Sequence, residues 1–462
     1  MVNNSKGGVH MKGNIDVLED DVLKLFIKYA IPSILGVLGM SSYVFFDTMF
    51  IGQGLGSEGL AALNIVLPVF SLFNATAFLF GMGGGAAISV CIGKKKYNKV
   101  NEIFTHALIL SVIIGGIYTL IGTIFLDKLC YFLGADASTI TLVKEYLRII
   151  MAMSIGFVLV GELNVFVRND KSPKLAMWSM IIPSLVNIVL DYIFIFPMGM
   201  GMKGAALATA ISPVTSLLML STHFIKKESM LKLSFKGIKF GIMKRIILNG
   251  FPSFIVEISA GVVIFAFNIV ISYLSGSIGL AAYGIIANVA IICRGVFNGT
   301  AQAIQPILSV NYGAEKYDRV KKCLFIARVT AFTLGGLFLL IGILFPRNLV
   351  NIFSNDGEKL VSITVTGIYI YFTSFLIEGI NTVNLAYFQA VENVKSSSII
   401  SITRGFVGVF TGLIFLPQMF GLKGVWATVP FSESVTFIVS ITCFLIFDKV
   451  ITKNKISLKG IN

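Results

Sequence analysis

The sequence has 462 residues, of which 56% are hydrophobic and 13% are charged, and its formal net charge is +14 at pH 7. Soluble domains carry about 25% charged residues, so this composition excludes a set of soluble domains. Apolar runs of about 20 residues, the length that crosses a bilayer, recur along nearly the whole chain, which also excludes a nucleic-acid-binding protein and a disulfide-rich secreted module. The sequence predicts an all-α polytopic membrane protein.

Twelve transmembrane helices are predicted after a polar N-terminal segment, residues 1–27, that does not resemble a cleavable signal peptide. The predicted spans are residues 28–52, 60–90, 104–126, 145–167, 175–196, 204–224, 246–274, 281–311, 323–345, 361–389, 397–417 and 424–447. A basic linker, residues 225–245, separates the sixth span from the seventh, and residues 448–462 form a basic tail.

Lysine and arginine residues are distributed unevenly between the two sides of the predicted membrane. The side that carries the N-terminus has 28 of them, the opposite side has 6, and 3 lie within or at the edge of spans. The positive-inside rule therefore predicts that both termini lie in the cytoplasm.

The two halves of the chain repeat each other at an offset of 220 residues. GLAALNI at 59–65 matches GLAAYGI at 279–285, and GKKKYNKV at 93–100 matches GAEKYDRV at 313–320. Each half contains six spans, an even number, so the repeats are parallel and define an N-lobe, residues 28–224, and a C-lobe, residues 246–447. This organisation is typical of secondary transporters. No filter sequence favours a channel, and no P-loop, zinc or nucleophile motif favours an enzyme.

Several segments resemble the multidrug and toxic compound extrusion (MATE) family, and most closely its DinF-like and MepA-like bacterial branch. They are YAIPSILG at 29–36, FFDTMFIG at 45–52, GLAALNIVLP at 59–68, NIVLDYIFIF at 187–196 and GMKGAALAT at 201–209. The loop after the second span lacks the pattern of the other twelve-span class, the major facilitators.

The resemblance implies two six-helix bundles around a V-shaped cleft in the cytoplasmic membrane of a bacterium. It also implies a monomeric antiporter that exports hydrophobic or cationic amphipathic drugs in exchange for H⁺ or Na⁺. Membrane lipid is the expected surrounding, and neither a nucleic-acid partner nor a cofactor other than the coupling ion is expected.

Two aspartates lie deep within predicted spans of the N-lobe, where a charge is costly. At a rise of about 1.5 Å per residue, Asp47 lies roughly 29 Å and Asp191 roughly 24 Å from the cytoplasmic ends of their spans, at a level that Thr209 also reaches. Asn187 and Tyr43 lie one helical turn below the two aspartates. The oxygen atoms of the two aspartates, the asparagine and the threonine suit Na⁺, and two adjoining carboxylates equally suit a proton. Tyr43 is a secondary candidate. The alternative is that each aspartate caps a helix end.

By resemblance, Asp47, Asn187, Asp191 and Thr209 match the cation site of the family. Pro32, in the same span as Asp47, is a candidate hinge that would link cation binding to the cleft.

The C-lobe contains both acidic and basic residues within its spans. Glu257, Glu378 and Glu433 share their bundle with Arg294 and Arg404, which predicts a mainly ion-paired structural network. In the NorM-like branch of the family, acids on spans 7 and 10 contribute to coupling. Glu378 fits the second of these positions, whereas Glu257 departs from the first, so Glu257, Arg294 and Glu378 are secondary candidates.

An alternative function is that of a flippase for a lipid-linked glycan, from related families with the same two-lobe plan. Such a substrate carries phosphates and requires a strongly cationic cleft, but only two arginines of the C-lobe are deep. The glycines at 81–85 are expected to allow a close approach between helices.

Overall fold

The structure is a computed structural model that describes residues 15–225, 229–235, 237–353 and 357–459. The first part of the predicted N-terminal segment, residues 1–14, and the end of the predicted tail, residues 460–462, lie outside the described residues. The helices are α1 Val22–Gly93, α2 Tyr97–Ile124, α3 Leu126–Phe132, α4 Ile140–Ala152, α5 Ser154–Asn169, α6 Pro173–Ile195, α7 Gly201–Ile225, α8 Phe240–Gly313, α9 Tyr317–Leu344, α10 Pro346–Asn351, α11 Glu358–Tyr371, α12 Phe375–Ala390, α13 Val394–Ile402, α14 Gly408–Phe420 and α15 Leu422–Lys459.

The two longest helices each cover two predicted spans. α1 has 72 residues and α8 has 74, and their helical geometry is interrupted at Gly56 and Gly276, where φ is +69° and +59°. These two glycines are 220 residues apart, so the sequence repeat extends to the backbone. When α11 is counted together with α12 and α13 together with α14, nine described helical segments are long and apolar enough to cross a membrane, or ten if the bent pair α4 and α5 counts as one span. With α1 and α8 each covering two, the described helices accommodate the twelve predicted spans.

Three predicted spans are less regular than the sequence indicates. α4 and α5 meet at Met153 at a bend of 53°, and the equivalent place in the C-lobe is the 3₁₀ turn Phe372–Ser374 between α11 and α12. A π-helical turn, Thr403–Val407, separates α13 from α14. Proline and glycine are the usual sequence signals of a kink, and neither occurs at Met153 or in the 3₁₀ turn, so these interruptions were not predicted.

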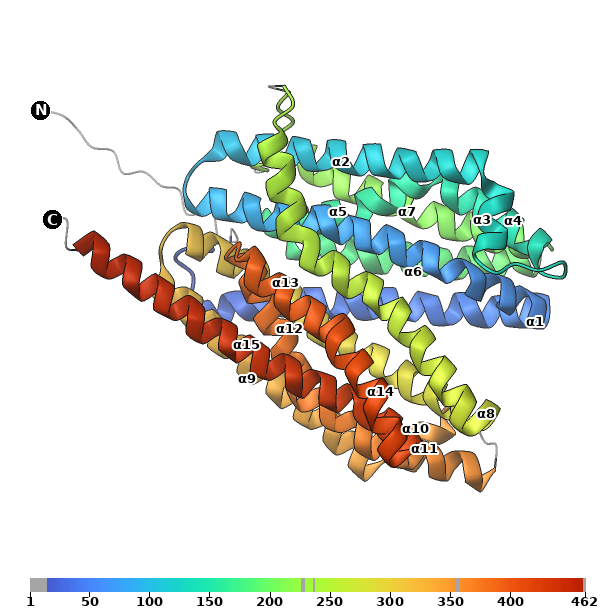
Figure 1. The fold of residues 1–462 in the computed structure, drawn as a ribbon. Coiled ribbons are helices and arrows are strands. Elements are labelled where there is room, and N and C mark those ends of the chain that lie inside the picture. Colours follow the sequence, from blue (N-terminus) through green and yellow to red (C-terminus); the bar gives the residue numbers. More distant parts are fainter. Residues whose placement is uncertain (1–14, 226–228, 236, 354–356, 460–462) are drawn as a thin grey trace, which may run out of the picture.

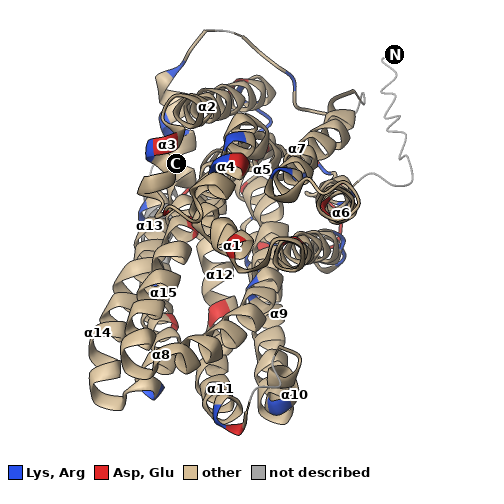
Figure 2. Cartoon of the chain, turned by 90° about the vertical axis from the view of Figure 1, so that its right-hand side faces the viewer, with Lys and Arg blue, Asp and Glu red and all other residues tan. Residues whose placement is uncertain are grey.

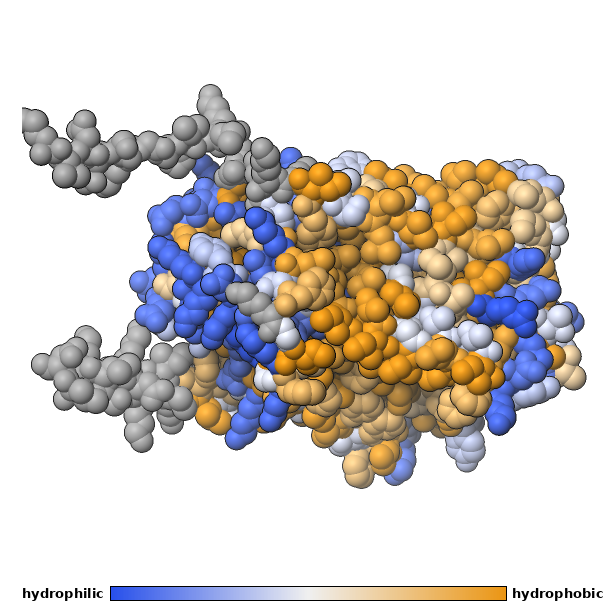
Figure 3. Space-filling view, turned by 90° about the horizontal axis from the view of Figure 1, so that it is seen from above, coloured by the Kyte–Doolittle hydropathy of each residue, from blue (hydrophilic) through white to orange (hydrophobic). Residues whose placement is uncertain are grey.

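The helices form two groups that meet at one end of the molecule and spread at the other (Figure 1). Helices α1 to α7 make one group and α8 to α15 the other, and the first and last described residues lie at the end where the groups meet. We call this end the terminal face. On the face shown in Figure 3, hydrophilic residues gather at this end, and a broad apolar band covers the middle of the molecule. From the opposite end, most of the helical surface is free of charged residues (Figure 2). This banding is that of a multi-pass membrane protein.

Polar contacts join the two lobes at the terminal face. Arg168 of α5 donates from Nη1 to Oε1 of Gln302 in α8 at 2.7 Å. Nη2 of Arg319, near the start of α9, donates to the carbonyl oxygens of Val17 and Asp20 at 3.2 and 2.6 Å. The lobes are therefore closed on this face, and their separation lies toward the opposite end.

The linker between the lobes is bound along the N-lobe. The backbone N–H of Lys232 donates to Oδ1 of Asn101, and that of Lys239 donates to Nε2 of His106, both at 2.9 Å. Leu231, directly before Lys232, is 3% exposed. The linker thereby fixes the start of α8 against α2, and α8 begins at residue 240, inside the segment predicted as a linker.

Glycines allow the backbones of α1 and α8 to touch. A Cβ atom on Gly83 would collide with the carbonyl oxygen of Ile246, and one on Gly250 would collide with that of Leu79. The close approach predicted for the glycine cluster is confirmed, and it brings the two lobes together.

Gly83→Val is expected to prevent closure of the terminal face, because the added side chain has no space against α8. Cys91 of α1, which is 3% exposed beside Arg245 of α8, would then react severalfold faster with a polar maleimide than in the wild type, whose described cysteines are all buried. Gly116→Val is the matched control, since a Cβ on Gly116 meets nothing within 4 Å. Equal labelling in the two variants would contradict the prediction.

Candidate functional site

The two buried aspartates of the N-lobe adjoin each other. Asp47 of α1 is 6% exposed and Asp191 of α6 is 0% exposed, and their carboxyl groups are close enough to share a hydrogen bond when one is protonated. Among the described residues, no basic side chain pairs with either carboxylate. Within the described part of the chain, both oxygens of Asp191 and Oδ1 of Asp47 also lack a hydrogen-bond donor. Neither residue therefore behaves as a helix cap.

Further oxygen atoms surround this pair. Asn187 is 0% exposed and its amide group is unpartnered among the described residues, while Thr209 of α7 is 3% exposed. Tyr146 of α4 donates from its hydroxyl to Oγ1 of Thr209 at 3.4 Å. Tyr146 and Tyr43 both lie close enough to the two aspartates to interact with them electrostatically.

The structure thus brings together Tyr43, Asp47, Asn187, Asp191 and Thr209. Sequence reasoning missed Tyr146, because it stands at the edge of a predicted span and the inward tilt of α4 has no sequence signal.

The chemistry of this cluster fits a small hard cation. Isolated buried carboxylates are costly unless a positive charge or a proton compensates them, and the surrounding groups supply oxygen ligands without a competing lysine or arginine. Asp47, Asn187, Asp191 and Thr209 would hold Na⁺, or the two carboxyl groups would hold a proton. Elsewhere in the described part of the chain, no group of three or more His, Cys, Asp or Glu side chains is placed to bind a metal ion.

The repeat does not place a second such cluster in the C-lobe. The position equivalent to Asp47 is Phe267, which is 0% exposed. The rings of Phe267 and Tyr283 stack with centroids 5.2 Å apart, and Tyr283 stacks in turn on Trp426 at 6.3 Å. An aromatic stack therefore fills the C-lobe where the N-lobe has an acid.

The C-lobe contains the ion-paired network that the sequence predicted. Nε of Arg294 lies 2.9 Å from Oε1 of Glu378, and Nη2 of Arg404 lies 3.2 Å from the same oxygen. Nε of Arg404 also lies 2.8 Å from Oε1 of Glu433. The π-helical turn contains Arg404 and directs it at both acids. Two of the secondary candidates, Arg294 and Glu378, are members of this network, whereas Glu257 is not.

A cleft of about 560 Å³ lies between the lobes and is lined by residues of both. Tyr43 and Thr209 belong to its wall, so the acidic cluster of the N-lobe borders the cleft directly. Glu257, Arg294 and Glu378 also line it. Pro32 does not, and α1 passes through it as continuous helix, so a hinge at Pro32 stays a prediction.

Comparisons with known proteins agree on one family. The MatE family model matches residues 32–193 and 252–414, two segments that begin 220 residues apart. The chain is 26% identical over 419 residues to the multidrug export protein MepA of Staphylococcus saprophyticus, covering 90% of this chain and 92% of that protein. It is 27% identical to the protein of the same name from Staphylococcus haemolyticus, covering 90% and 92%.

Solved structures show the same architecture. The outward-facing conformation of a multidrug resistance MATE family transporter of the MOP superfamily aligns with a TM-score of 0.90 at 25% identity, covering 96% of this chain and 99% of that one. A MATE protein in complex with MaL6 aligns with a TM-score of 0.89 at 26% identity, covering 96% and 100%.

Fold and cleft together define a multi-pass membrane protein with the twelve-helix architecture of MATE transporters, which confirms the predicted fold class. The chain belongs to the MatE family.

Proposed function

We propose that the protein is a multidrug exporter in which H⁺ or Na⁺ moving inward through the N-lobe drives hydrophobic or cationic compounds outward. The observation that carries this proposal is the unpaired couple Asp47 and Asp191 beside the cleft. The relatives named multidrug export protein and the transporter structures support the same direction.

The geometry links the proposed ion site to the surface of the cleft that would contact cargo. When bound, the cation or proton compensates one of the two negative charges and so relieves the repulsion between the carboxylates. Tyr43 and Thr209 belong both to the acidic cluster and to the wall of the cleft, so a change of charge at the aspartates alters the surface that cargo contacts. Coupling follows when the ion and the cargo favour different arrangements of the lobes. The excess of lysine and arginine predicted for this side of the membrane supports a cytoplasmic terminal face.

The flippase alternative has less support in this cleft. A lipid-linked phosphate requires arginines that are available to bind it. Both deep arginines, Arg294 and Arg404, instead contact glutamates at 2.8 to 3.2 Å. A phosphate would compete with these carboxylates for the two arginines.

Transport in inside-out membrane vesicles tests the proposal. With tetraphenylphosphonium outside, imposing a sodium gradient or a pH gradient separately, with the higher ion concentration inside, is expected to drive its accumulation in one of the two cases. Vesicles without the protein serve as the control. Absence of gradient-driven accumulation under both conditions would contradict ion-coupled export.

A further inference from the structure

The charged groups that line the cleft do not balance. They are Glu257, Glu378 and Glu433 together with Arg294 and Arg404, all from the C-lobe, and the N-lobe contributes polar uncharged and apolar residues. The three carboxylates and two guanidinium groups leave one net negative charge. This excess negative charge is not distributed equally over the three carboxylates.

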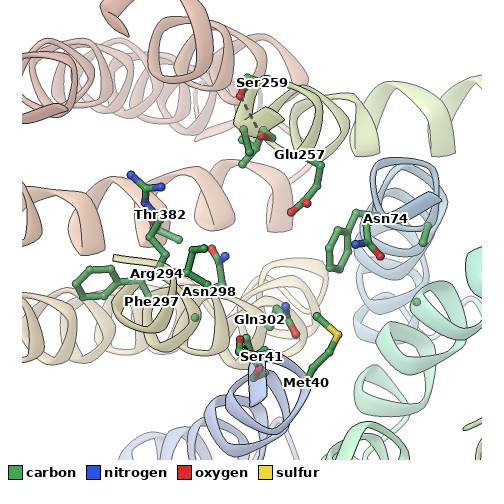
Figure 4. Close-up of a pocket in the computed structure, with 18 of the residues that line it drawn as sticks. Met40, Ser41, Asn74, Glu257, Ser259, Arg294, Phe297, Asn298, Gln302 and Thr382 are labelled. Carbon is green, nitrogen blue, oxygen red and sulfur yellow. Dashed lines mark hydrogen bonds between the residues drawn. The ribbon is translucent and has the colours of Figure 1, made fainter. Parts of the chain in front are cut away.

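Glu257 carries the unbalanced charge. Glu378 and Glu433 are each held by arginine, whereas none of the hydrogen bonds or ion pairs among the described residues involves Glu257. Its side chain leaves α8 and points into the space between Asn74 of α1 and Gln302 and Asn298 farther along α8 (Figure 4). The carboxylate therefore faces the cavity rather than the protein interior.

The surroundings of Glu257 differ from those of the acidic cluster. The repeat places Phe267, ten residues farther along α8, at the position equivalent to Asp47, and the counterpart of Glu257 in the N-lobe is Val37. Glu257 is a single acid, not one of a pair, and it lies on the lobe that faces the cluster across the cleft. Its position on the wall of the cleft suits a contact with bound cargo.

The walls around this carboxylate suit a bulky organic cation. Aromatic side chains from both lobes, Phe78, Phe157 and Phe297, line the cleft with it, and rings of this kind attract cations as well as apolar groups. A cavity of about 560 Å³ lies within the range that holds a drug-sized molecule. A single carboxylate in a mostly apolar cavity favours a monovalent cation, since a second positive charge would remain unpaired.

We propose that Glu257 is the residue that selects cationic cargo, by pairing with the positive group of a monovalent amphipathic compound bound in the cleft. This assignment rests on the proposed export function and specifies its substrate contact. It separates two roles, because Asp47 and Asp191 bind the ion whereas Glu257 binds the charge of the cargo.

Binding to the purified full-length protein in detergent tests the assignment. Equilibrium dialysis compares tetraphenylphosphonium, a permanent cation, with triphenylphosphine oxide, an uncharged compound of similar shape. Glu257→Gln is expected to raise the Kd of the cation about tenfold or more, which corresponds to about 1.4 kcal/mol, and to leave the Kd of the uncharged compound unchanged. Glu257→Asp, which keeps the charge, should retain most of the affinity for the cation.

A matched control is Glu145→Gln, which makes the same chemical change at an exposed residue of α4 outside the cleft and is expected to bind both compounds normally. Unchanged cation binding in Glu257→Gln would overturn the assignment while gradient-driven transport by the wild type still supports export. An equal loss of both compounds, with Glu257→Asp equally impaired, would also overturn it, because it would show a structural role. If the wild type bound neither compound, the export proposal and the assignment would fail together.

Discussion

Asp47→Asn is expected to abolish ion-driven efflux while the protein remains in the membrane at its normal level. The amide has nearly the shape of the carboxyl group but neither its negative charge nor its exchangeable acidic proton, so the cluster loses the group that attracts the cation. Because Asp47 has no ion-pair partner among the described residues, its neutralisation leaves no opposite charge unpaired. The thermal stability of the variant should therefore not fall below that of the wild type.

The measurement is gradient-driven accumulation of tetraphenylphosphonium in inside-out vesicles, with the amount of protein determined in the same vesicles. Asp191→Asn should give the same result. Asp318→Asn, the same substitution at an exposed position in the first turn of α9, is the control and should transport normally. Wild-type efflux in either cluster variant would refute the role of the two aspartates.

Arg404→Met is expected to cause the largest loss of stability among the substitutions considered. The Arg404 side chain is 14% exposed and contacts Glu378 and Glu433. Removing one partner of a buried ion pair costs about 3–5 kcal/mol, because it leaves an uncompensated buried charge. Among the described residues, the Glu433 carboxylate would keep only its hydrogen bond from Asn381, and the melting temperature in detergent should fall sharply.

Two controls separate this effect from a general loss of charge. The double variant Arg404→Gln with Glu433→Gln should recover part of the melting temperature, since it removes charges of both signs. Arg347→Met should have little effect, because the side chains of Arg347 and Glu358 are 70% and 76% exposed and such pairs contribute little. Equal melting temperatures for Arg404→Met and Arg347→Met would show that the network has no structural role.

Much of the fold follows from sequence periodicity. The twelve spans follow from their apolar lengths, and the parallel arrangement of the lobes follows from the 220-residue repeat. The breaks at Gly56 and Gly276 are themselves one repeat apart. The bend at Met153 was not predictable, since it depends on how α4 packs against the rest of the bundle and not on a local breaker residue.

The part of the candidate site that was predictable is the pair of aspartates, because their depth along their helices can be read from the sequence. Asp47 and Asp191 lie at similar heights on separate spans, and the structure places them side by side. The C-lobe required more information. The numbers of acids and arginines predicted an ion-paired network. Which acid stays outside the network depends on how each helix is rotated about its axis, and the sequence does not give this rotation. Only the structure shows that Glu257 faces the cleft while Glu378 and Glu433 face arginine.

Counterflow in proteoliposomes tests the central claim most directly. An outward gradient of tetraphenylphosphonium is imposed across liposomes that contain the purified protein, and the opposite movement of sodium or protons is recorded with a radioactive tracer or a pH dye. The account predicts counterflow of one of these ions in the wild type and none in the double variant Asp47→Asn with Asp191→Asn. Undiminished counterflow in the double variant would contradict it.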